Sequence, residues 1–393
     1  MNKRVYLLTI VSFVVGMVEL IIGGILDLVA KDLNISLGQA GFLITVFSLV
    51  FAIASPVLLV VTAKMERKKL TLITLIAFFC ANLVAIFSFS YSLLVLARIL
   101  SAASGSLLVV LCITMASSIV TEQYRARAIG VIFMGISASL VLGVPIGLLL
   151  GNAFGWRAPF IFIAALTLLS LAGVYFFMDR MAPKPSVPLS VQIRTLKNRK
   201  LLFAQLTSFL FLAGHLTLYG YLTPFLKEAL GFGGTMVSIV YLIFGCAAVT
   251  GGGIGGFLAD RLGTARSIIS FIVLFAIIMF VIPYTTFSVP VFLLVMIIWS
   301  MLSWAITPAM QSYLIESSSA ETADVQQGLN NTALHLGIAF GSAVGGYVIE
   351  QSSVLSNASV GACFIIVALV TSLISITAGV RRYKVKHPNH TAS

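Results

Sequence analysis

Long, almost continuous apolar runs follow one another along this chain, and they decide which solvent it folds in. Of its 393 residues, 60% are hydrophobic and only 9% are charged, whereas soluble domains contain about 25% charged residues. A soluble fold of this size could not hide so much apolar surface, because a large exterior always remains in water. The composition also excludes disordered, collagen-like and disulfide-rich chains. Most of the chain is therefore expected to lie in a membrane.

The apolar runs have the length of membrane-spanning helices. About 20 mostly apolar residues cross the hydrocarbon as a helix, and the runs lack the alternation of a membrane β-barrel. The sequence predicts an all-α membrane protein with twelve transmembrane helices. The predicted spans are 5–30, 38–62, 70–90, 92–118, 128–151, 158–178, 201–226, 233–257, 267–284, 290–315, 327–349 and 358–380.

The lysines and arginines predict the orientation. Most of the 24 basic residues lie at the termini or after even-numbered spans, whereas Lys31, Arg157 and Lys227 fall on the other side. Cytoplasmic loops are enriched in Lys and Arg. We therefore expect both termini to be cytoplasmic. The net charge of +12 is then a topology signal, and no nucleic-acid partner is expected.

The chain divides into two halves of six spans each. The longest internal break, 179–200, carries three prolines and six basic residues and is predicted to be a cytoplasmic linker. It separates a bundle at 1–178 from a bundle at 201–380, and a cytoplasmic tail follows at 381–393. Related motifs after spans 2 and 8, and glycine-rich stretches in spans 5 and 11, favour two pseudo-symmetric six-helix bundles, as in many transporters.

Glu19 is the carboxylate that lies deepest inside a span. A charge at that depth costs several kcal/mol, so the residue must face a cavity, a partner or a proton. Ser12, Gly16, Gly23 and Asp27 share its helix face. We expect Glu19 to carry the coupling proton. The alternative is a protonated glutamate that hydrogen-bonds two helices together.

Arg98 and His215 are the other titratable groups whose position inside an apolar span needs an explanation. Arg98 in span 4 requires a counter-charge or carbonyl groups, and pairing with Glu19 would couple it to the proton; a fixed strut between helices is the alternative. His215 lies in span 7 at the depth of Glu19, with Tyr219 and Thr223 on the same face. Histidine titrates near neutral pH. His215 is thus predicted to bind substrate, share the proton, or do both. The alternative is that it only packs between helices.

Polar residues in spans 10 and 11 predict substrate contacts. Trp304 and Gln311 share one face of span 10, and Asn331 and His335 share one face of span 11. Amides, an imidazole and an indole in a mostly apolar cavity suit the edges and faces of a nucleobase. Hydrogen bonding between helices is the ordinary alternative.

Span 5 contains glycines and a proline that predict packing without chemistry. Gly143 and Gly147 are four residues apart, which lets helix backbones approach closely, and Pro145 removes a backbone hydrogen bond and bends the span. We expect this segment to pack and seal the two halves against each other.

Several motifs together resemble the major facilitator superfamily over the whole chain. Gly256-x-x-x-Asp260-Arg261-x-Gly after span 8 is similar to its motif A, which implies a gate in which this loop clamps neighbouring helix ends. Arg98 is similar to motif B. Gly143, Pro145 and Gly147 are similar to motif C, which is typical of the twelve-span drug:proton antiporter branch. The first-half copy of motif A departs from the pattern, with Ala63 and Glu66 where the family has Asp and Gly.

A closer resemblance is to bacterial purine base and nucleoside efflux pumps. It is carried by segments 16–24, 124–130, 213–219 and 311–316. It implies proton-driven export of purine bases, nucleosides or their analogues by a multi-pass protein of the bacterial cell membrane. No cofactor is implied, since the proton gradient supplies the energy. The expected partners are a small-molecule substrate, protons and lipid, and a monomer is expected.

Other functions fit the sequence less well. Multidrug or sugar efflux by the same antiport mechanism is the alternative substrate assignment. A membrane enzyme is disfavoured, because the spans show no metal cluster, nucleophile–base pair or paired catalytic carboxylates. A passive channel or receptor is disfavoured by the twofold repeat and the single deep acid.

Overall fold

The computed structural model describes residues 3–183, 187–319 and 322–386, and these form helices joined by short connections. Twelve spans are long and apolar enough to cross a membrane, which confirms the predicted fold class. The N-terminal half contains α1 (Lys3–Leu33), α2 (Leu37–Val61), α3 (Arg67–Ile86), α4 (Tyr91–Ser118), η1 (Glu122–Tyr124), α5 (Arg125–Ala138), η2 (Ser139–Gly143), α6 (Val144–Phe154) and α7 (Ala158–Phe177). The C-terminal half contains α9 (Arg199–Tyr219), α10 (Leu222–Leu230), α11 (Gly234–Leu262), α12 (Thr264–Val281), η3 (Ile282–Thr285), α13 (Val289–Glu316), α14 (Ala323–Gln351) and α15 (Ser356–Lys386).

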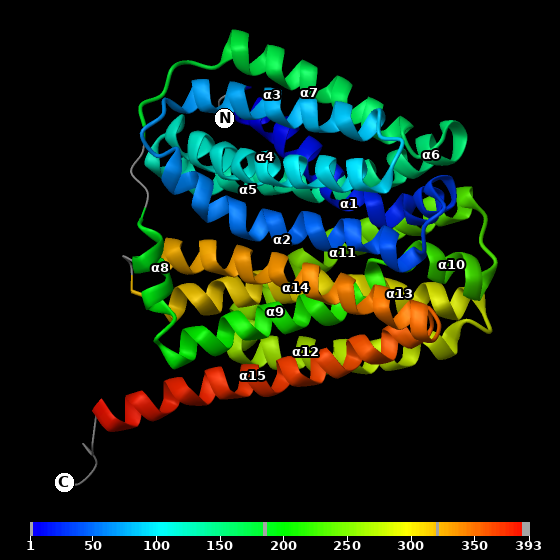
Figure 1. Cartoon of the computed structure of the whole chain (residues 1–393). Coiled ribbons are helices and arrows are strands. Elements are labelled where there is room, and N and C mark those ends of the chain that lie inside the picture. Colours follow the sequence, from blue (N-terminus) through cyan, green and yellow to red (C-terminus); the bar gives the residue numbers. More distant parts are fainter. Residues whose placement is uncertain (1–2, 184–186, 320–321, 387–393) are drawn as a thin grey trace.

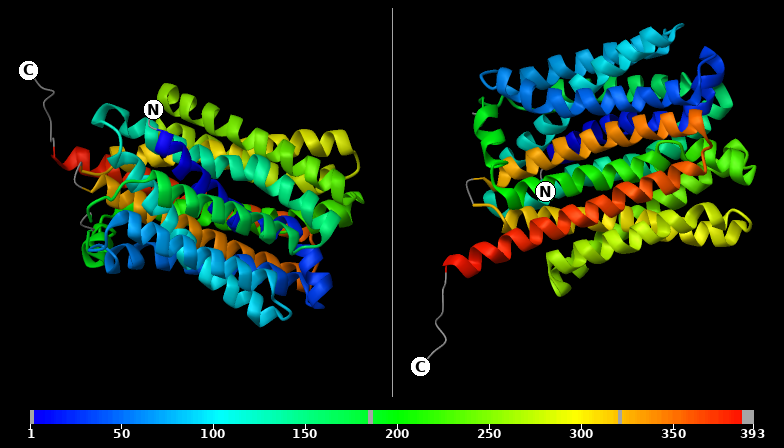
Figure 2. Two further views of the ribbon diagram at one scale, coloured as in Figure 1. Left: turned by 90° about the horizontal axis from the view of Figure 1, so that it is seen from above. Right: turned by 60° about the horizontal axis from the view of Figure 1, so that its bottom comes forward.

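The two halves lie side by side as two bundles (Figure 1). The short helix α8 (Leu189–Thr195) belongs to the predicted linker and lies at the end of the molecule where α1 begins and α15 ends. We call this end the linker side and the opposite end the far side. The long helices run between the two sides in every view (Figure 2). Helix α15 continues to Lys386, so the first part of the predicted tail 381–393 is helical, and residues 387–393 lie outside the described residues.

Three spans depart from a regular α-helix, each for a local reason. Helix α1 bends at Ile25, directly after Gly23 and Gly24. Span 5 contains the π-helical turn η2, in which the N–H of Val144 bonds the carbonyl of Ser139. Pro145, which has no N–H to offer, follows one residue after this turn. Span 7 breaks after Tyr219 and resumes as α10.

The halves meet along two antiparallel helix pairs. Helix α2 packs against α14, with Gly38 facing Gly346 near the far side and Phe51 stacked on His335 farther in. Helix α11 packs against η2 and α6 in the far-side part of span 5. There a Cβ on Gly245 would lie 2.7 Å from the Cα of Val141. A glycine is needed at this close approach.

Span 5 packs against α11 of the other half as expected, but its motif C glycines face α1 within their own bundle. A Cβ on Gly147 would overlap a methyl group of Ile21, and one on Gly143 would lie 3.2 Å from Met17. Both partners are on α1, in the same bundle. The sequence showed that the glycines allow close packing but could not show which neighbour they face. Gly245 of α11 makes the corresponding close contact between the halves.

Two glycines of α11 bring it against α13 within the C-terminal half. A Cβ on Gly251 or Gly255 would overlap the carbonyl oxygen of Met301 or Ala305. This spacing of four residues is the small-residue pattern that lets membrane helices touch through their backbones. Gly253 lies on another face of the helix and is exposed, and a Cβ added there would meet no atom within 4 Å.

We predict that Gly255→Ala destabilises the protein, whereas Gly253→Ala does not. The new methyl group at 255 overlaps backbone atoms that cannot move aside, at a cost of about 1–3 kcal/mol. At 253 the same change gains helix propensity. Thermal unfolding of both variants in detergent checks this, and equal melting temperatures would contradict the packing described.

Candidate functional site

Glu19 and His335 form an ion pair between the two halves. The Oε1 atom of Glu19 lies 3.2 Å from Nε2 of His335, and both residues sit near the middle of their helices, α1 and α14. The carboxylate side chain is 19% exposed and the imidazole 10%. The ring of Phe51 on α2 stacks on the imidazole, with centroids 4.1 Å apart and planes 8° apart. The predicted proton carrier thus meets a predicted substrate residue.

The hydrogen bonding of His335 assigns the proton of its neutral ring to one nitrogen. Nδ1 lies 2.9 Å from the carbonyl oxygen of Asn331, which only accepts hydrogen bonds, so Nδ1 is assigned as the protonated nitrogen. Nε2 of the neutral ring is then an acceptor facing another acceptor, the carboxylate. One further proton, on Nε2 or on the carboxyl group, makes the contact attractive. Without that proton, a lone pair of Nε2 faces a lone pair of the carboxylate oxygen, and the two atoms repel.

Arg98 is buried beside this pair and binds carbonyl groups. Its Nη1 donates to the carbonyl of Val18 at 2.7 Å and its Nε to that of Leu43 at 3.5 Å, while the guanidinium lies 4.0 Å from the centroid of the Phe47 ring. Val18 directly precedes Glu19. No ion pair between Arg98 and Glu19 forms among the described residues; the arginine instead fixes α1 and α2 around the carboxylate.

His215 and Tyr219 lie in an aromatic group within the C-terminal half. We call it the aromatic cluster, and it consists of His215, Tyr219, Tyr241, Phe244, Phe275 and Trp299. The imidazole of His215 stacks near the Tyr219 ring at 5.2 Å and meets the Trp299 ring edge-on at 5.3 Å. His215 and Glu19 therefore belong to two separate arrangements, one inside the C-terminal half and one between the halves.

The remaining predicted substrate residues lie on α13 and α14. Trp304 and Gln311 are half-buried on α13, and Asn331 is half-buried on α14. The carbonyl of Gln311 accepts a hydrogen bond from Nε2 of Gln327 at 3.0 Å, which joins α13 to α14. Asn331 contributes its carbonyl to His335. Of these residues, Asn331 is the one that bonds a member of the ion pair among the described residues.

Hydrogen bonds and ion pairs link the halves at the far side. Nζ of Lys227 lies 2.5 Å from Oδ2 of Asp27, and the hydroxyl of Thr223 donates to the carbonyl of Gly24 at 2.9 Å. The hydroxyl of Tyr241 donates to the carbonyl of Gly23 at 3.3 Å. The bend in α1 leaves these carbonyls free to accept. Ser36, which caps α2, also bonds the carboxylate of Glu350.

The motif A residues lie at the linker side. Asp260 and Arg261 belong to the last turn of α11 and are exposed, rather than in a loop, and the guanidinium of Arg261 lies over the ring of Phe257 at 4.5 Å. Gly256 lies next to Pro308 of α13. The bond to the neighbouring helix end is made instead by Thr264, whose hydroxyl donates to Glu316 at 2.9 Å.

Glu66, the departure from motif A, has a defined structural role. Its carboxylate caps α3 by accepting the N–H groups of Lys68 and Lys69, and it also accepts that of Met181 beyond α7, at 2.8–2.9 Å. Burial would raise the pKa of Glu66, but the backbone donors of Met181, Lys69 and Lys68 outweigh it and lower the pKa. The acid therefore ties span 3 to span 6 within one bundle.

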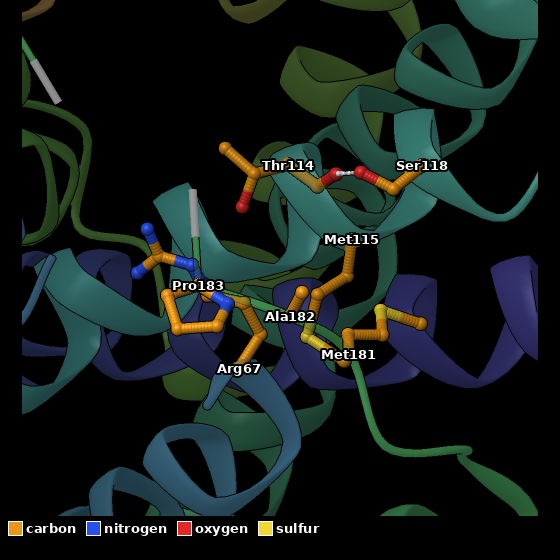
Figure 3. A pocket seen from close by; sticks show the side chains of 7 residues that line it. All are labelled: Arg67, Thr114, Met115, Ser118, Met181, Ala182 and Pro183. Atoms are coloured by element: carbon orange, nitrogen blue, oxygen red, sulfur yellow. Dashed lines mark hydrogen bonds between the residues drawn. The ribbon is translucent and has the colours of Figure 1, made fainter. Parts of the chain in front are cut away.

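Two cavities lie away from the ion pair. One of about 300 Å³ opens at the linker side of the N-terminal bundle (Figure 3) and is lined by Arg67, Thr114, Met115, Ser118, Met181, Ala182 and Pro183. Another of about 310 Å³ lies at the far-side seam and is lined by Gly38, Gln39, Phe42, Tyr91, Ala343, Gly346, Tyr347 and Glu350. In the described part of the chain, no three His, Cys, Asp or Glu side chains gather as a metal site.

Sequence reasoning missed several of these partners. Phe47 and Phe51, one turn apart on α2, lie against the guanidinium of Arg98 and the imidazole of His335, which no local pattern shows. Asp27 and Lys227 did carry a signal. Both are charges near the far-side ends of apolar spans, where isolated charges need partners.

The geometry is that of a two-bundle membrane carrier with a titratable pair between its halves, and known proteins agree with it. The Major Facilitator Superfamily model matches residues 8–342. The chain belongs to this superfamily. It is 35% identical to the MFS-type transporter YbcL of Bacillus subtilis over 94% of this chain and 95% of that protein. It is 26% identical to the inner membrane transport protein YdhP of Escherichia coli over 89% of each chain.

Solved structures of superfamily members share its fold. A bacterial homologue of the human lysosomal transporter Spinster, in an inward-facing and occupied conformation, matches with a TM-score of 0.80 and 15% identity over 96% of both chains. A D-xylose–proton symporter matches with a TM-score of 0.77 and 16% identity, over 94% of this chain and 96% of that one. The chain is therefore a multi-pass transporter of the MFS type.

Proposed function

We propose that this transporter is a proton-coupled antiporter that exports purine bases, nucleosides or their analogues. The observation that carries the coupling is the contact between Glu19 and His335, which joins the two halves at a distance where the pair can share one proton. A carrier of two bundles works by moving one bundle against the other. A proton that decides whether the bundles attract at mid-span therefore decides which conformation is favoured.

The coupling follows from the chemistry of the pair. With one proton, Glu19 and His335 attract and α1 is held against α14. Without it, the carboxylate faces the lone pair of Nε2 and the contact repels. Arg98, which is fixed to the neighbouring carbonyl of Val18, then supplies positive charge close to the deprotonated carboxylate. Proton release and separation of the helices thus occur together.

The orientation in the membrane rests on the placement of charge. The linker side carries the termini and α8, where most basic residues gather, and we assign it to the cytoplasm. The bonds from Asp27, Thr223 and Tyr241 then close the side that faces the cell exterior. Both importers and exporters pass through such a conformation, so the export direction is taken from the resemblance to efflux pumps.

The purine assignment is supported by the resemblance to purine efflux pumps and by the side chains present. Gln311, Gln327 and Asn331 are half-buried amides on α13 and α14, and aromatic rings gather on α9, α11 and α13. Amides pair with the polar edges of a base, and rings pack on its faces. We propose that the transporter acts as a monomer, with both sites in one chain.

Transport into proteoliposomes tests this function, and we expect hypoxanthine to accumulate in an acidic lumen. An antiporter exchanges outgoing protons for incoming substrate. A difference of two pH units can drive roughly 100-fold accumulation for one-to-one exchange, because each tenfold ratio corresponds to about 1.4 kcal/mol. Radiolabelled hypoxanthine, guanosine and a cationic dye are compared, with protein-free liposomes as the control.

Each outcome decides a different part of the proposal. Accumulation of purines in an acidic lumen supports antiport and the substrate class together. Accumulation of the dye alone would overturn the purine assignment and leave antiport standing. Accumulation only when the exterior is acidic would overturn antiport, because that is the behaviour of a symporter.

A further inference from the structure

Three polar atoms inside the aromatic cluster have no hydrogen-bond partner among the described residues. They are Nδ1 of His215, the hydroxyl of Tyr219 and Nε1 of Trp299. These residues are 6%, 7% and 0% exposed. Leaving one such atom unpaired when buried costs about 1–3 kcal/mol, and buried polar groups are usually satisfied. Three in one cluster point to a ligand that satisfies them.

The three atoms belong to rings that contact one another. The His215 and Trp299 rings lie 5.3 Å apart, and Tyr219 lies 5.2 Å from His215 and 6.4 Å from Trp299. They come from α9 and α13, and Phe244 of α11 packs against all three rings. An indole N–H donates, while a hydroxyl and an imidazole nitrogen donate or accept. The cluster therefore offers both kinds of hydrogen bond between aromatic faces.

The cluster reaches the seam between the halves through Tyr241. The ring of Tyr241 lies 6.1 Å from that of Tyr219, and its hydroxyl donates to the carbonyl of Gly23 on α1. A molecule that separates Tyr219 from Tyr241 would enter from this seam. Displacing Tyr241 in this way would also strain its hydrogen bond to Gly23, which helps to close the far side.

We infer that the aromatic cluster is a binding site for a neutral, planar heteroaromatic ring, with Trp299, Tyr219 and His215 bonding its polar edge. This rests on the proposed function and names the site that takes the substrate. None of the six cluster residues is a carboxylate. A permanent cation binds to aromatic faces but, without hydrogen-bonding groups of its own, would leave the three polar atoms unpaired. Offset rings and a few directed hydrogen bonds match a purine base. Recognition thus occurs in the C-terminal half, apart from the Glu19–His335 pair.

Binding of hypoxanthine to the purified transporter in lipid nanodiscs tests this site. Trp299→Phe and Tyr219→Phe each remove one hydrogen-bonding group and keep an aromatic ring. We expect each to raise the Kd for hypoxanthine about 2- to 13-fold, the range for one lost hydrogen bond. The Kd for unsubstituted purine, which lacks the carbonyl group of hypoxanthine, changes less in at least one variant. Tyr284→Phe removes an exposed phenol outside the cluster and is the matched control.

The results separate the site from the function. If the parent binds and transports hypoxanthine but both variants bind it within twofold of the parent, the site is wrong and the function stands. Equal losses for hypoxanthine and purine in both variants would also overturn it, because they indicate a packing role. A parent that binds no purine overturns the site and the purine function together. Melting temperatures near that of the parent show that the variants are folded.

Discussion

Glu19→Gln is expected to abolish proton-driven accumulation while leaving substrate exchange intact. Glutamine keeps the size of the side chain and a hydrogen-bonding carbonyl, but it neither gains nor loses a proton in this pH range. The pair with His335 then no longer changes between attraction and repulsion. Accumulation in an acidic lumen should fall from roughly 100-fold to about onefold, whereas counterflow of labelled for unlabelled hypoxanthine, with no pH gradient, continues.

A control and a partner variant make this result specific. Asp324→Asn exchanges a carboxylate for an amide at an exposed position of α14 and should keep full accumulation. His335→Gln removes the other member of the pair and should give the same uncoupled exchange as Glu19→Gln. Proton-driven accumulation at the parent level in Glu19→Gln would show that another group carries the proton. Loss of accumulation and exchange together would point instead to a structural role for Glu19.

The membrane fold could be predicted from the sequence because the bilayer imposes strong rules. Each span requires a long apolar run, and a charge inside a run stands out against it. Glu19, Arg98 and His215 were found in this way. The two-bundle arrangement followed from the repeat and from the basic linker. These features depend on residues close together in the chain, or on their side of the membrane.

The partners of those residues could not be predicted, because they depend on how helices turn against one another. Arg98 was a candidate partner for Glu19, but its guanidinium binds the carbonyls of Val18 and Leu43 instead. His335 was expected to contact substrate and lies on Glu19. Span 7 was expected to be continuous, so that Thr223 would share the face of His215. The break after Tyr219 lets Thr223 bond α1.

The contacts that join the two halves at the far side can be tested directly, because α6 and α11 approach closely enough there for a disulfide. The end of the Asn152 side chain on α6 lies 2.6 Å from the point that a Cβ on Gly234 of α11 would occupy. The two Cβ atoms are thus at most about one bond length farther apart, no more than roughly 4 Å, and disulfides require about 3.5–4.5 Å. Asn152 is exposed and Gly234 half-buried, so an oxidant reaches both.

Oxidation of the variant Asn152→Cys/Gly234→Cys is expected to stop transport, and reduction to restore it. The native cysteines Cys80, Cys112, Cys246 and Cys363 are free and are first replaced by alanine. A bond between α6 and α11 holds the halves together at the far side, so the bundles cannot rock apart there. Uptake should fall below about a tenth of the reduced rate, while each single-cysteine variant is unaffected by the oxidant. Full transport by the cross-linked protein would mean that these helix ends stay together throughout the cycle, and the far-side contacts would then be a permanent part of the fold rather than a gate.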